Sequence, residues 1–144
     1  MATYRTTAKS PMTPEQTFDY LADFRTAAEW DVNTKSSDLV SGDPMSDGAE
    51  YKVVTEFAGR DLTLTYRSAG LQRPGKIVFR SETAVADIED VITISPDGSG
   101  SEVSYEANIK PKSIAKVLDP VFKLIFNQVG DRAAQSLKET LASK

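Results

Sequence analysis

Hydrophobic and polar residues alternate with a period of two from about residue 36 to residue 110, most clearly in 51–57 and 103–110. This period is typical of antiparallel strands that have one buried face and one solvated face. Short segments of turn-forming residues interrupt the alternation, so the pattern predicts about six strands joined as hairpins. The turns are expected at Asp47-Gly48, Ala58-Gly59, Arg73-Pro74-Gly75 and Pro96-Asp97-Gly98-Ser99-Gly100.

The N-terminal part of the chain follows other patterns. Residues 2–9 are rich in threonine and predict a first strand. Thr13-Pro14-Glu15-Gln16 then predicts the start of a helix, because Thr13 can cap it, proline suits the first helical position and Gln16 completes a capping box. A second short helix is expected around residues 24–30.

The C-terminal part of the chain has helical spacing from residue 113. Asp119-Pro120 predicts the start of a main helix of about 24 residues, with Asp119 as its cap and Pro120 as its first residue. Residues 113–118 would then form a separate short helical segment. The inner apolar stripe of the main helix is predicted to contain Phe122, Ile125, Phe126, Val129, Ala133 and Leu137.

The order of these elements predicts an α+β fold. A strand, two short helices, six further strands and a long helix follow one another without an internal repeat or linker, so residues 1–144 are expected to form a single domain. The long C-terminal helix is the element large enough to cover the buried face of a curved, seven-stranded antiparallel sheet. On residue type alone, the large side chains between them are expected to fill a core. They are Trp30, Tyr51, Phe57, Tyr66, Phe79, Tyr105, Phe122 and Phe126.

The segment 88–94 is ambiguous. Ile88, Asp90, Ile92 and Ile94 share one parity, so that either Asp90 faces inward or a β-bulge shifts the register. We expect the bulge or a solvated strand end, which is the more ordinary interpretation of such a segment. The three acids of this segment, Asp87, Glu89 and Asp90, lack the spacing of a metal-binding loop, and no metal or cofactor is expected.

The residue types that are missing narrow the chemistry. Among its 144 residues the chain has no cysteine and no histidine. A disulfide, a thiolate nucleophile and the Ser-His-Asp and Cys-His mechanisms are therefore excluded, and any proton transfer falls to Asp, Glu, Tyr, Lys or Arg. Because only a buried carboxylate would titrate near neutrality, ligand binding is expected to be constant between about pH 6 and 8.

Charge and hydropathy restrict the partners. The net charge is −4 and no cluster of Lys and Arg occurs, which argues against nucleic-acid binding. No apolar stretch reaches the about 18 residues of a membrane span. The segment Met1–Arg5 lacks the apolar run of a signal peptide, so a soluble cytoplasmic protein is expected.

Five features in a characteristic order resemble a known superfamily. They are the segment Met12–Asp23, Trp30 after a short helix, Asp47-Gly48 before the strand 51–57, Gly100-Ser101-Glu102-Val103 at the start of the last strand, and Leu137-Lys138-Glu139-Thr140-Leu141. Together they cover nearly the whole chain and resemble the SRPBCC superfamily, which has the helix-grip fold of START and birch-pollen-allergen proteins. The branch that the chain is most similar to contains polyketide cyclases, dehydrases and lipid-transport proteins.

The resemblance implies an elongated hydrophobic cavity between the sheet and the last helix, in place of a filled core. It implies that the eight large residues named above line this cavity and contact a small hydrophobic ligand. In the superfamily, loops between strands and the start of the last helix close the cavity. By resemblance these correspond here to the turns 58–60 and 71–75 and to the segment 112–124.

Three functions remain open. The first, which we favour, is binding or carriage of a lipid, polyketide or isoprenoid-like molecule without catalysis. The second is a cyclase- or dehydratase-like enzyme without metal, for which spacing identifies no acid–base pair. The third is a protein-interaction module. A deep cavity with only hydroxyls favours the first, a buried carboxylate beside a tyrosine the second, and a filled cavity with an exposed apolar patch the third.

A second apolar seam is expected on the C-terminal helix. Val117, Val121 and Leu124 are spaced by four and three and lie roughly 90–120° from the inner stripe. They are either scattered surface residues or a contact surface, namely a mobile lid or a homodimer interface.

Overall fold

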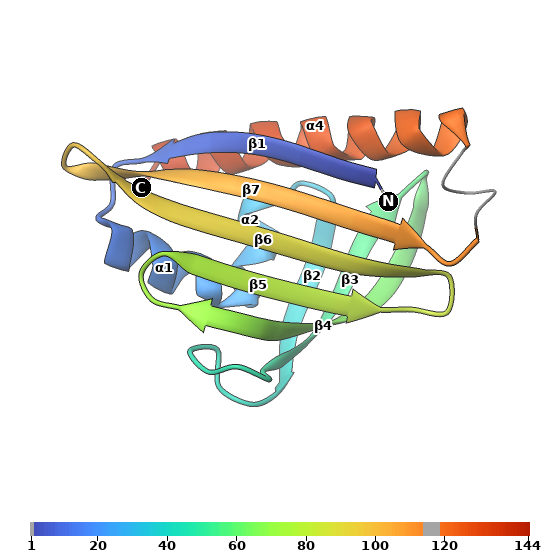
Figure 1. Ribbon diagram of the computed structural model, residues 1–144, viewed down its shortest axis with the longest axis horizontal. Coiled ribbons are helices and arrows are strands. Elements are labelled where there is room, and N and C mark those ends of the chain that lie inside the picture. The colour runs from blue at the N-terminus through green and yellow to red at the C-terminus, as the bar shows by residue number, and fades with distance from the viewer. Residues whose placement is uncertain (1, 114–118) are drawn as a thin grey trace.

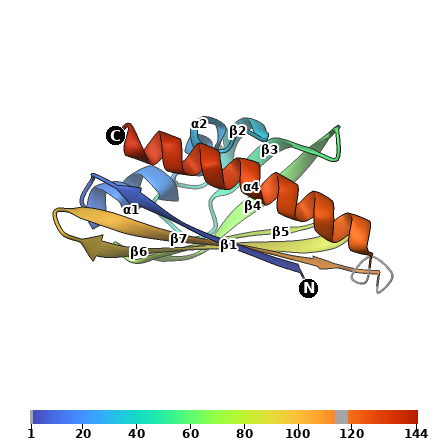
Figure 2. The same cartoon turned by 90° about the horizontal axis from the view of Figure 1, so that it is seen from above.

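One antiparallel sheet and a long helix make up most of the molecule (Figures 1 and 2). The computed structural model describes residues 2–113 and 119–144. The sheet has the seven antiparallel strands that were predicted, and their order is β1-β7-β6-β5-β4-β3-β2. The elements are β1 (Ala2–Ser10), α1 (Pro14–Ala22), the 3-10 helix η1 (Phe24–Thr26), α2 (Ala27–Trp30), β2 (Thr34–Ser41), β3 (Glu50–Phe57), β4 (Arg60–Gln72), β5 (Lys76–Glu82), β6 (Ala86–Asp97), β7 (Gly100–Pro111) and α4 (Pro120–Ala142).

The sheet curves around the helices. Figure 2 shows α1, α2 and α4 on one side of β5, β6 and β7, with β2 and β3 rising on that same side. Helix α4 runs along β1 and also contacts α2. This arrangement confirms the predicted helix-grip architecture. Within the described ranges, no helix is long and apolar enough to cross a membrane.

Both predicted helix starts are confirmed. The Thr13 side chain accepts a hydrogen bond from the backbone N–H of Gln16, and the Gln16 side chain accepts one from the backbone N–H of Thr13. Asp119 caps α4 by accepting from the N–H of Val121, and Pro120 is the first helical residue. Of the short helical segment expected at 113–118, residues 114–118 lie outside the described part of the chain.

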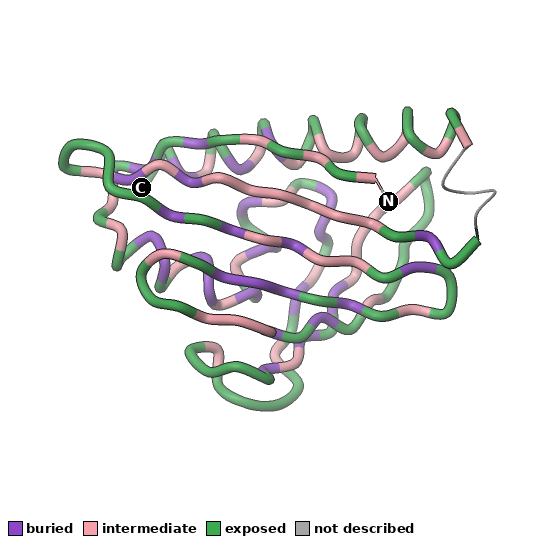
Figure 3. The backbone as a smooth tube through the Cα atoms, in the orientation of Figure 1, coloured by how far each residue is buried: buried purple, intermediate pink, exposed green. Residues whose placement is uncertain are grey.

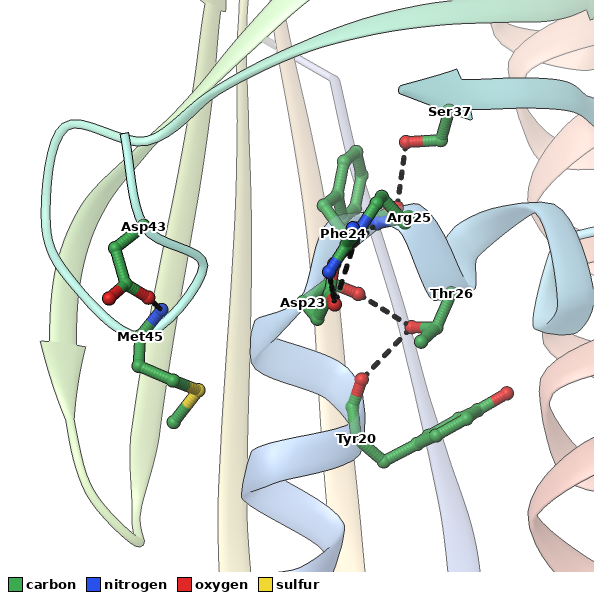
Figure 4. A network of polar contacts seen from close by, with 8 residues as sticks. All are labelled: Tyr20, Asp23, Phe24, Arg25, Thr26, Ser37, Asp43 and Met45. Carbon is green, nitrogen blue, oxygen red and sulfur yellow. Dashed lines mark hydrogen bonds and ion pairs between the residues drawn. The ribbon is translucent and has the colours of Figure 1, made fainter. Parts of the chain in front are cut away.

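The connection between α1 and β2 is fixed by a local polar network (Figure 4). Asp23 binds Arg25 in an ion pair of 2.7 Å and caps η1. The Thr26 hydroxyl donates to the carbonyls of Tyr20 and Asp23. Ser37 of β2 donates a 2.7 Å hydrogen bond to the carbonyl of Phe24. These bonds hold η1 and α2 against β2 and thereby set the position of the residues at the end of α2.

Strand β6 corrects the expectation for Asp90. The strand pairs with β5 and β7 in continuous register, without a bulge, and Asp90 lies opposite Phe79 on one side and Ala107 on the other. Asp90 faces inward and is only 7% exposed. It is therefore neither at a bulge nor on a solvated strand end, because the regular alternation of β6 carries it to the buried face.

The core is concentrated near α1. Buried side chains gather where α1, η1 and the middle of the sheet meet, as the purple segments of Figure 3 show. Phe24 packs against Tyr51, Tyr66 and Phe79, with ring centroids 5.9, 5.0 and 4.2 Å away. Phe18 is almost completely buried in the same core. Toward the first turns of α4 the tube is mainly intermediate or exposed, so this end of the molecule is less completely packed (Figure 3).

Candidate functional site

A cavity of about 390 Å³ lies between the sheet and α4. Its wall is mainly apolar, with residues contributed by β1, β3, β4, β6, β7, the end of α2 and the inner face of α4. On α4, Phe122, Phe126, Val129, Ala133 and Leu137 line it, which are five of the six residues predicted for the inner stripe. The space therefore exists because the side chains of the curved sheet and of α4 do not meet over this stretch.

Six of the eight predicted site residues line the cavity. They are Trp30, Phe57, Tyr66, Tyr105, Phe122 and Phe126. The other two, Tyr51 and Phe79, are fully buried in the aromatic core with Phe24 and are not part of the cavity wall. Alternation assigned the strand residues, and helical spacing Phe122 and Phe126, to the inner side, but neither pattern could tell which part of it is packed and which is open.

The rim of the cavity differs in part from the expectation. Phe57 of the β3–β4 hairpin, Val85 of the β5–β6 turn and Phe122 at the start of α4 all line it. Val85 is strongly exposed, which shows where the cavity reaches the surface. The turn 71–75 does not belong to this rim, because Arg73 forms an ion pair with Asp19 of α1 at 2.8 Å. That turn closes the packed end of the molecule instead.

The inner wall of the cavity carries a carboxylate beside a tyrosine. The Tyr105 hydroxyl donates a 2.7 Å hydrogen bond to Asp90 Oδ2. Burial raises the pKa of Asp90 to about 7, with smaller upward effects from the charges of Asp31 and Glu89, while the bond from Tyr105 lowers it. Burial, together with the nearby Asp90, also raises the pKa of Tyr105 well above its usual value. Asp90 is therefore the buried carboxylate that the sequence analysis allowed as the exception, and its change of protonation near neutral pH removes the ground for expecting ligand binding to be constant between about pH 6 and 8.

A second carboxylate in the wall, Asp31, was missed by sequence reasoning. It follows Trp30 at the end of α2, where its Oδ1 accepts from the N–H of Asn33 and its Oδ2 from the hydroxyl of Thr34. Burial raises its pKa, and these hydrogen bonds together with the charge of Arg132 act in the opposite direction. The Asp-x-Asn-Thr sequence is a typical Asx-turn signal, which identifies the local bonds but not the cavity.

Two other polar groups of the wall are incompletely paired. The indole Nε1 of Trp30 and the Oδ1 of Asn33 are buried and have no hydrogen-bond partner among the described residues. The Nδ2 of Asn33 donates a 3.0 Å bond to the carbonyl of Val129, which ties the end of α2 to α4. Buried polar atoms are normally paired, so each of these atoms has unused hydrogen-bonding capacity beside the cavity.

The wall offers no evident metal site. In the described part of the chain, no group of three or more Asp and Glu side chains is placed so that it could hold a metal ion. Two acidic residues near Asp90 are solvated, as predicted, and each pairs with a basic side chain. Asp87 is exposed and lies 3.7 Å from Lys112, and Glu89 binds Arg80 at 2.8 Å on the outer face.

The second seam of α4 is exposed where it is described. Val121 is 61% and Leu124 58% exposed, close to Phe122 at the cavity rim. Val117 lies outside the described residues. The exposure agrees with the helical spacing that placed these residues away from the inner stripe.

An apolar cavity held between a curved antiparallel sheet and a C-terminal helix defines a helix-grip protein. The chain belongs to the family described as polyketide cyclase/dehydrase and lipid transport, whose sequence profile matches residues 1–142. This assignment confirms the SRPBCC resemblance. A sequence comparison with curated proteins gave no match.

Solved structures with the same fold have very different sequences. A START superfamily protein from Mycobacterium smegmatis is 14% identical, with a TM-score of 0.78 over 96% of both chains. The ZhuI aromatase/cyclase from Streptomyces sp. R1128 is 14% identical, with a TM-score of 0.77 over 97% of this chain and 90% of that one. The protein Ara h 8.0201 is 13% identical, with a TM-score of 0.70 over 99% of both chains. At these identities the likeness establishes the fold alone.

Proposed function

We propose that this protein binds a small hydrophobic molecule, of lipid, polyketide or isoprenoid type, in the cavity between the sheet and α4. The observation that carries the proposal is the cavity itself. Its volume of about 390 Å³ and its mainly apolar wall suit such a ligand. Ligand pockets typically measure about 300–1,000 Å³ and bury most of the ligand against apolar side chains. The six predicted residues that line the wall are then the ligand contacts, and Tyr51 and Phe79 support them from the core.

Fluorescence provides a direct test. Trp30 is the single tryptophan of the chain and lies in the cavity wall, so that a bound ligand should quench or shift its emission. A panel of fatty acids, fatty alcohols and aromatic polyketides should contain at least one ligand that binds at about 100 µM, which corresponds to roughly −5.5 kcal/mol. Native mass spectrometry should show the same ligand at one copy per chain. Absence of binding across the whole panel contradicts the proposal.

A filled cavity gives the matched control. Ala133 lines the cavity, whereas Ala142 is exposed near the end of the same helix. Ala133→Phe should occupy part of the space and weaken binding at least about tenfold, because a closely packed wall cannot accommodate the added phenyl ring and the ligand together. Ala142→Phe should bind as the parent does. Equal binding by both variants would place the ligand elsewhere.

A proton-transfer enzyme is the second candidate, because a buried carboxylate beside a tyrosine was the feature expected to favour it. Asp90 has a pKa of about 7 and lies in the cavity wall, so that it can accept a proton from a bound substrate near neutral pH. The interaction module was to be favoured by a filled cavity with an exposed apolar patch; Val121 and Leu124 are exposed, but the cavity is open, so this candidate loses support.

Exchange of carbon-bound hydrogen tests the enzyme candidate. A β-diketone dissolved in D₂O with the protein should exchange its central hydrogens faster than in buffer, with a rate that rises as Asp90 ionises near pH 7. Asp90→Asn should remove the acceleration, whereas Asp87→Asn should leave it unchanged because Asp87 is exposed. Acceleration that survives Asp90→Asn would rule out Asp90 as the base.

A further inference from the structure

The charged residues of the cavity wall all have the same sign. They are Asp31, Glu56 and Asp90, and neither lysine nor arginine occurs among the described residues that line the cavity. Charges act over a longer range in an apolar cavity than in water, so a wall of this kind repels an anionic ligand and attracts a cation. A fatty acid in its ionised form is therefore a poor match for this cavity, although its apolar chain fits.

Asp90 lacks a positive partner. Its Oδ2 accepts the bond from Tyr105, but its Oδ1 has no hydrogen-bond partner among the described residues. The charges that act on Asp90 come from Asp31 and Glu89, which are both acidic. A buried carboxylate without a counter-charge is unfavourable in its ionised form, and a cation placed beside it would relieve that cost.

Aromatic rings surround the same part of the cavity. The rings of Trp30 and Tyr105 are 5.4 Å apart in an edge-to-face arrangement, and Tyr66 lines the wall with them. Aromatic faces attract cations, most strongly where water is excluded. Asn33, which is 3% exposed, adds an unpaired acceptor, Oδ1, to this wall. Two unused acceptors and several aromatic rings suit a group with several N–H donors and a positive charge.

We propose that the ligand of this cavity is a lipophilic amine, seated with its protonated nitrogen on Asp90 and its apolar body along α4. The inference rests on the proposed ligand binding and specifies the chemical class of the ligand. A primary ammonium supplies three N–H donors, of which one can bind the free Oδ1 of Asp90.

The affinity should follow the ionisation of Asp90. An alkyl ammonium stays charged up to about pH 10, like the side chain of lysine, so the change near neutrality comes from the protein. The groups that face Asp90 are Asp31 from α2, Tyr66 from β4 and Tyr105 from β7, with Glu89 beside it on β6. The two tyrosines stay neutral in this range because burial raises the pKa of each well above 10.

Three probes that share a ten-carbon alkyl chain and differ in their head group separate the effect of charge from that of apolar contact. Decylamine, decanol and decanoate are titrated into the full-length protein at pH 8, with Trp30 emission and calorimetry as readouts. Decylamine should bind at least about tenfold more tightly than decanol, since a hydrogen bond between two charged groups is stronger than one made by a neutral hydroxyl. Decanoate should bind most weakly. Between pH 8 and pH 5 the preference for decylamine over decanol should shrink.

Variants assign the preference to Asp90. Asp90→Asn should bring decylamine to the affinity of decanol while decanol binding is retained. Asp87→Asn removes the same charge from an exposed position of the same strand, and it should keep the preference. If none of the probes and no member of the ligand panel binds, the proposed function itself fails. If decanol binds while decylamine gains nothing over it, or if the preference survives Asp90→Asn, ligand binding stands and the amine inference is overturned.

Discussion

Tyr105 and Asp90 form a diagonal pair across two neighbouring strands. Asp90 of β6 lies directly opposite Ala107 of β7, and Tyr105 is two residues from Ala107, on the same face of the sheet. The resulting 2.7 Å hydrogen bond joins the two side chains inside the cavity wall. Diagonal neighbours on one face are within reach of a long side chain such as tyrosine. This bond compensates part of the cost of placing a carboxyl group at an inward position.

The raised pKa of Asp90 makes stability depend on pH. Between pH 3.8 and about 7 the folded state keeps a proton that the unfolded state has lost. The free energy of unfolding should therefore fall as pH rises through this window. Above pH 7 Asp90 is ionised in the folded state as well, and the full destabilisation, the penalty for burying its charge, is then present. Asp90→Asn removes the penalty and should raise the free energy of unfolding at pH 8 by up to about 4 kcal/mol, with little gain at pH 4.

Urea unfolding at pH 4, 6 and 8 measures this effect. The raised pKa of Asp31 acts in the same direction, so the Asp90→Asn curve should become flatter without becoming flat. Asp87→Asn is the control with the same charge change at an exposed site and should run parallel to the parent. Parallel curves for Asp90→Asn and the parent would mean that the Asp90 pKa is not raised in the folded state.

Removing the hydroxyl of Tyr105 should raise the pKa of Asp90 further above the usual value of an aspartate. The bond that Tyr105 donates favours the ionised carboxylate, so Tyr105→Phe should raise the pKa of Asp90 above about 7. A carboxyl-carbon NMR titration follows Asp90 directly. Tyr66→Phe removes a hydroxyl from the same wall without breaking this bond, and the pKa of Asp90 should change less. A lower pKa of Asp90 in Tyr105→Phe would contradict the assigned effect of the hydrogen bond.

Much of the fold was predictable because its signals are local. The capping box at Thr13 and the cap at Asp119 depend on residues within three positions of each other, and strand alternation depends on neighbours two apart. The β5–β6 turn was not predicted, since it contains no glycine or proline. There the Thr83 hydroxyl accepts from the N–H groups of Val85 and Ala86, which replaces the usual turn residues.

The site was less predictable because its determinants are distant in sequence. Alternation alone places Asp90 inward, whereas a bulge or a solvated strand end is the more ordinary interpretation, and the inward position carries the cost of burying a carboxylate. The group that offsets the cost, Tyr105, is fifteen residues away on another strand. Asp31 reaches the cavity only because the network around Phe24 and Ser37 fixes the end of α2 against β2. The division of the inner face into core and cavity likewise depends on how far α4 stands from the sheet.

Gly130 allows α4 to approach β1 closely. A Cβ atom at this position would lie 2.5 Å from the ring of Tyr4, which is far too short for a real contact. Gly130→Ala gains about 1 kcal/mol of helix propensity but forces a shift that costs about 1–3 kcal/mol. We expect a net loss of about 1 kcal/mol in the free energy of unfolding.

The titration of Tyr4 reports whether its ring is displaced by the added Cβ of Gly130→Ala. Burial and the hydrogen bond from its hydroxyl to Asp131 raise the pKa of Tyr4 to about 12. In Gly130→Ala the displaced ring should lose that bond, and ultraviolet titration should find one additional tyrosine near pH 10. Asn127→Ala changes an exposed position of the same helix and should leave both stability and titration nearly unchanged. Unchanged stability and titration in Gly130→Ala would show that α4 and β1 can separate without cost.

The exposed apolar pair at the start of α4 should affect how the protein meets its ligand or a second copy of itself. Val121 and Leu124 are more than half exposed and lie beside Phe122 of the cavity rim. Neighbouring apolar side chains exposed at the rim of a cavity can form a contact surface for a ligand or for a second copy of the chain. Val121→Asp together with Leu124→Asp should therefore leave the fold intact and slow ligand uptake if the pair guides entry, or abolish self-association if it forms a dimer contact.

Circular dichroism, size-exclusion chromatography and stopped-flow Trp30 fluorescence distinguish these outcomes. The substituted positions are solvated, so the spectrum and the midpoint of thermal unfolding should stay close to those of the parent. Asn127→Asp together with Gln128→Asp adds the same charge to two exposed polar positions of α4 and controls for electrostatics. A lower association rate or a later elution volume only in the Val121/Leu124 variant supports a functional surface. If association rate and elution volume match the parent in both variants, these two side chains are ordinary surface residues, because neither a lid nor a dimer contact tolerates two buried carboxylates.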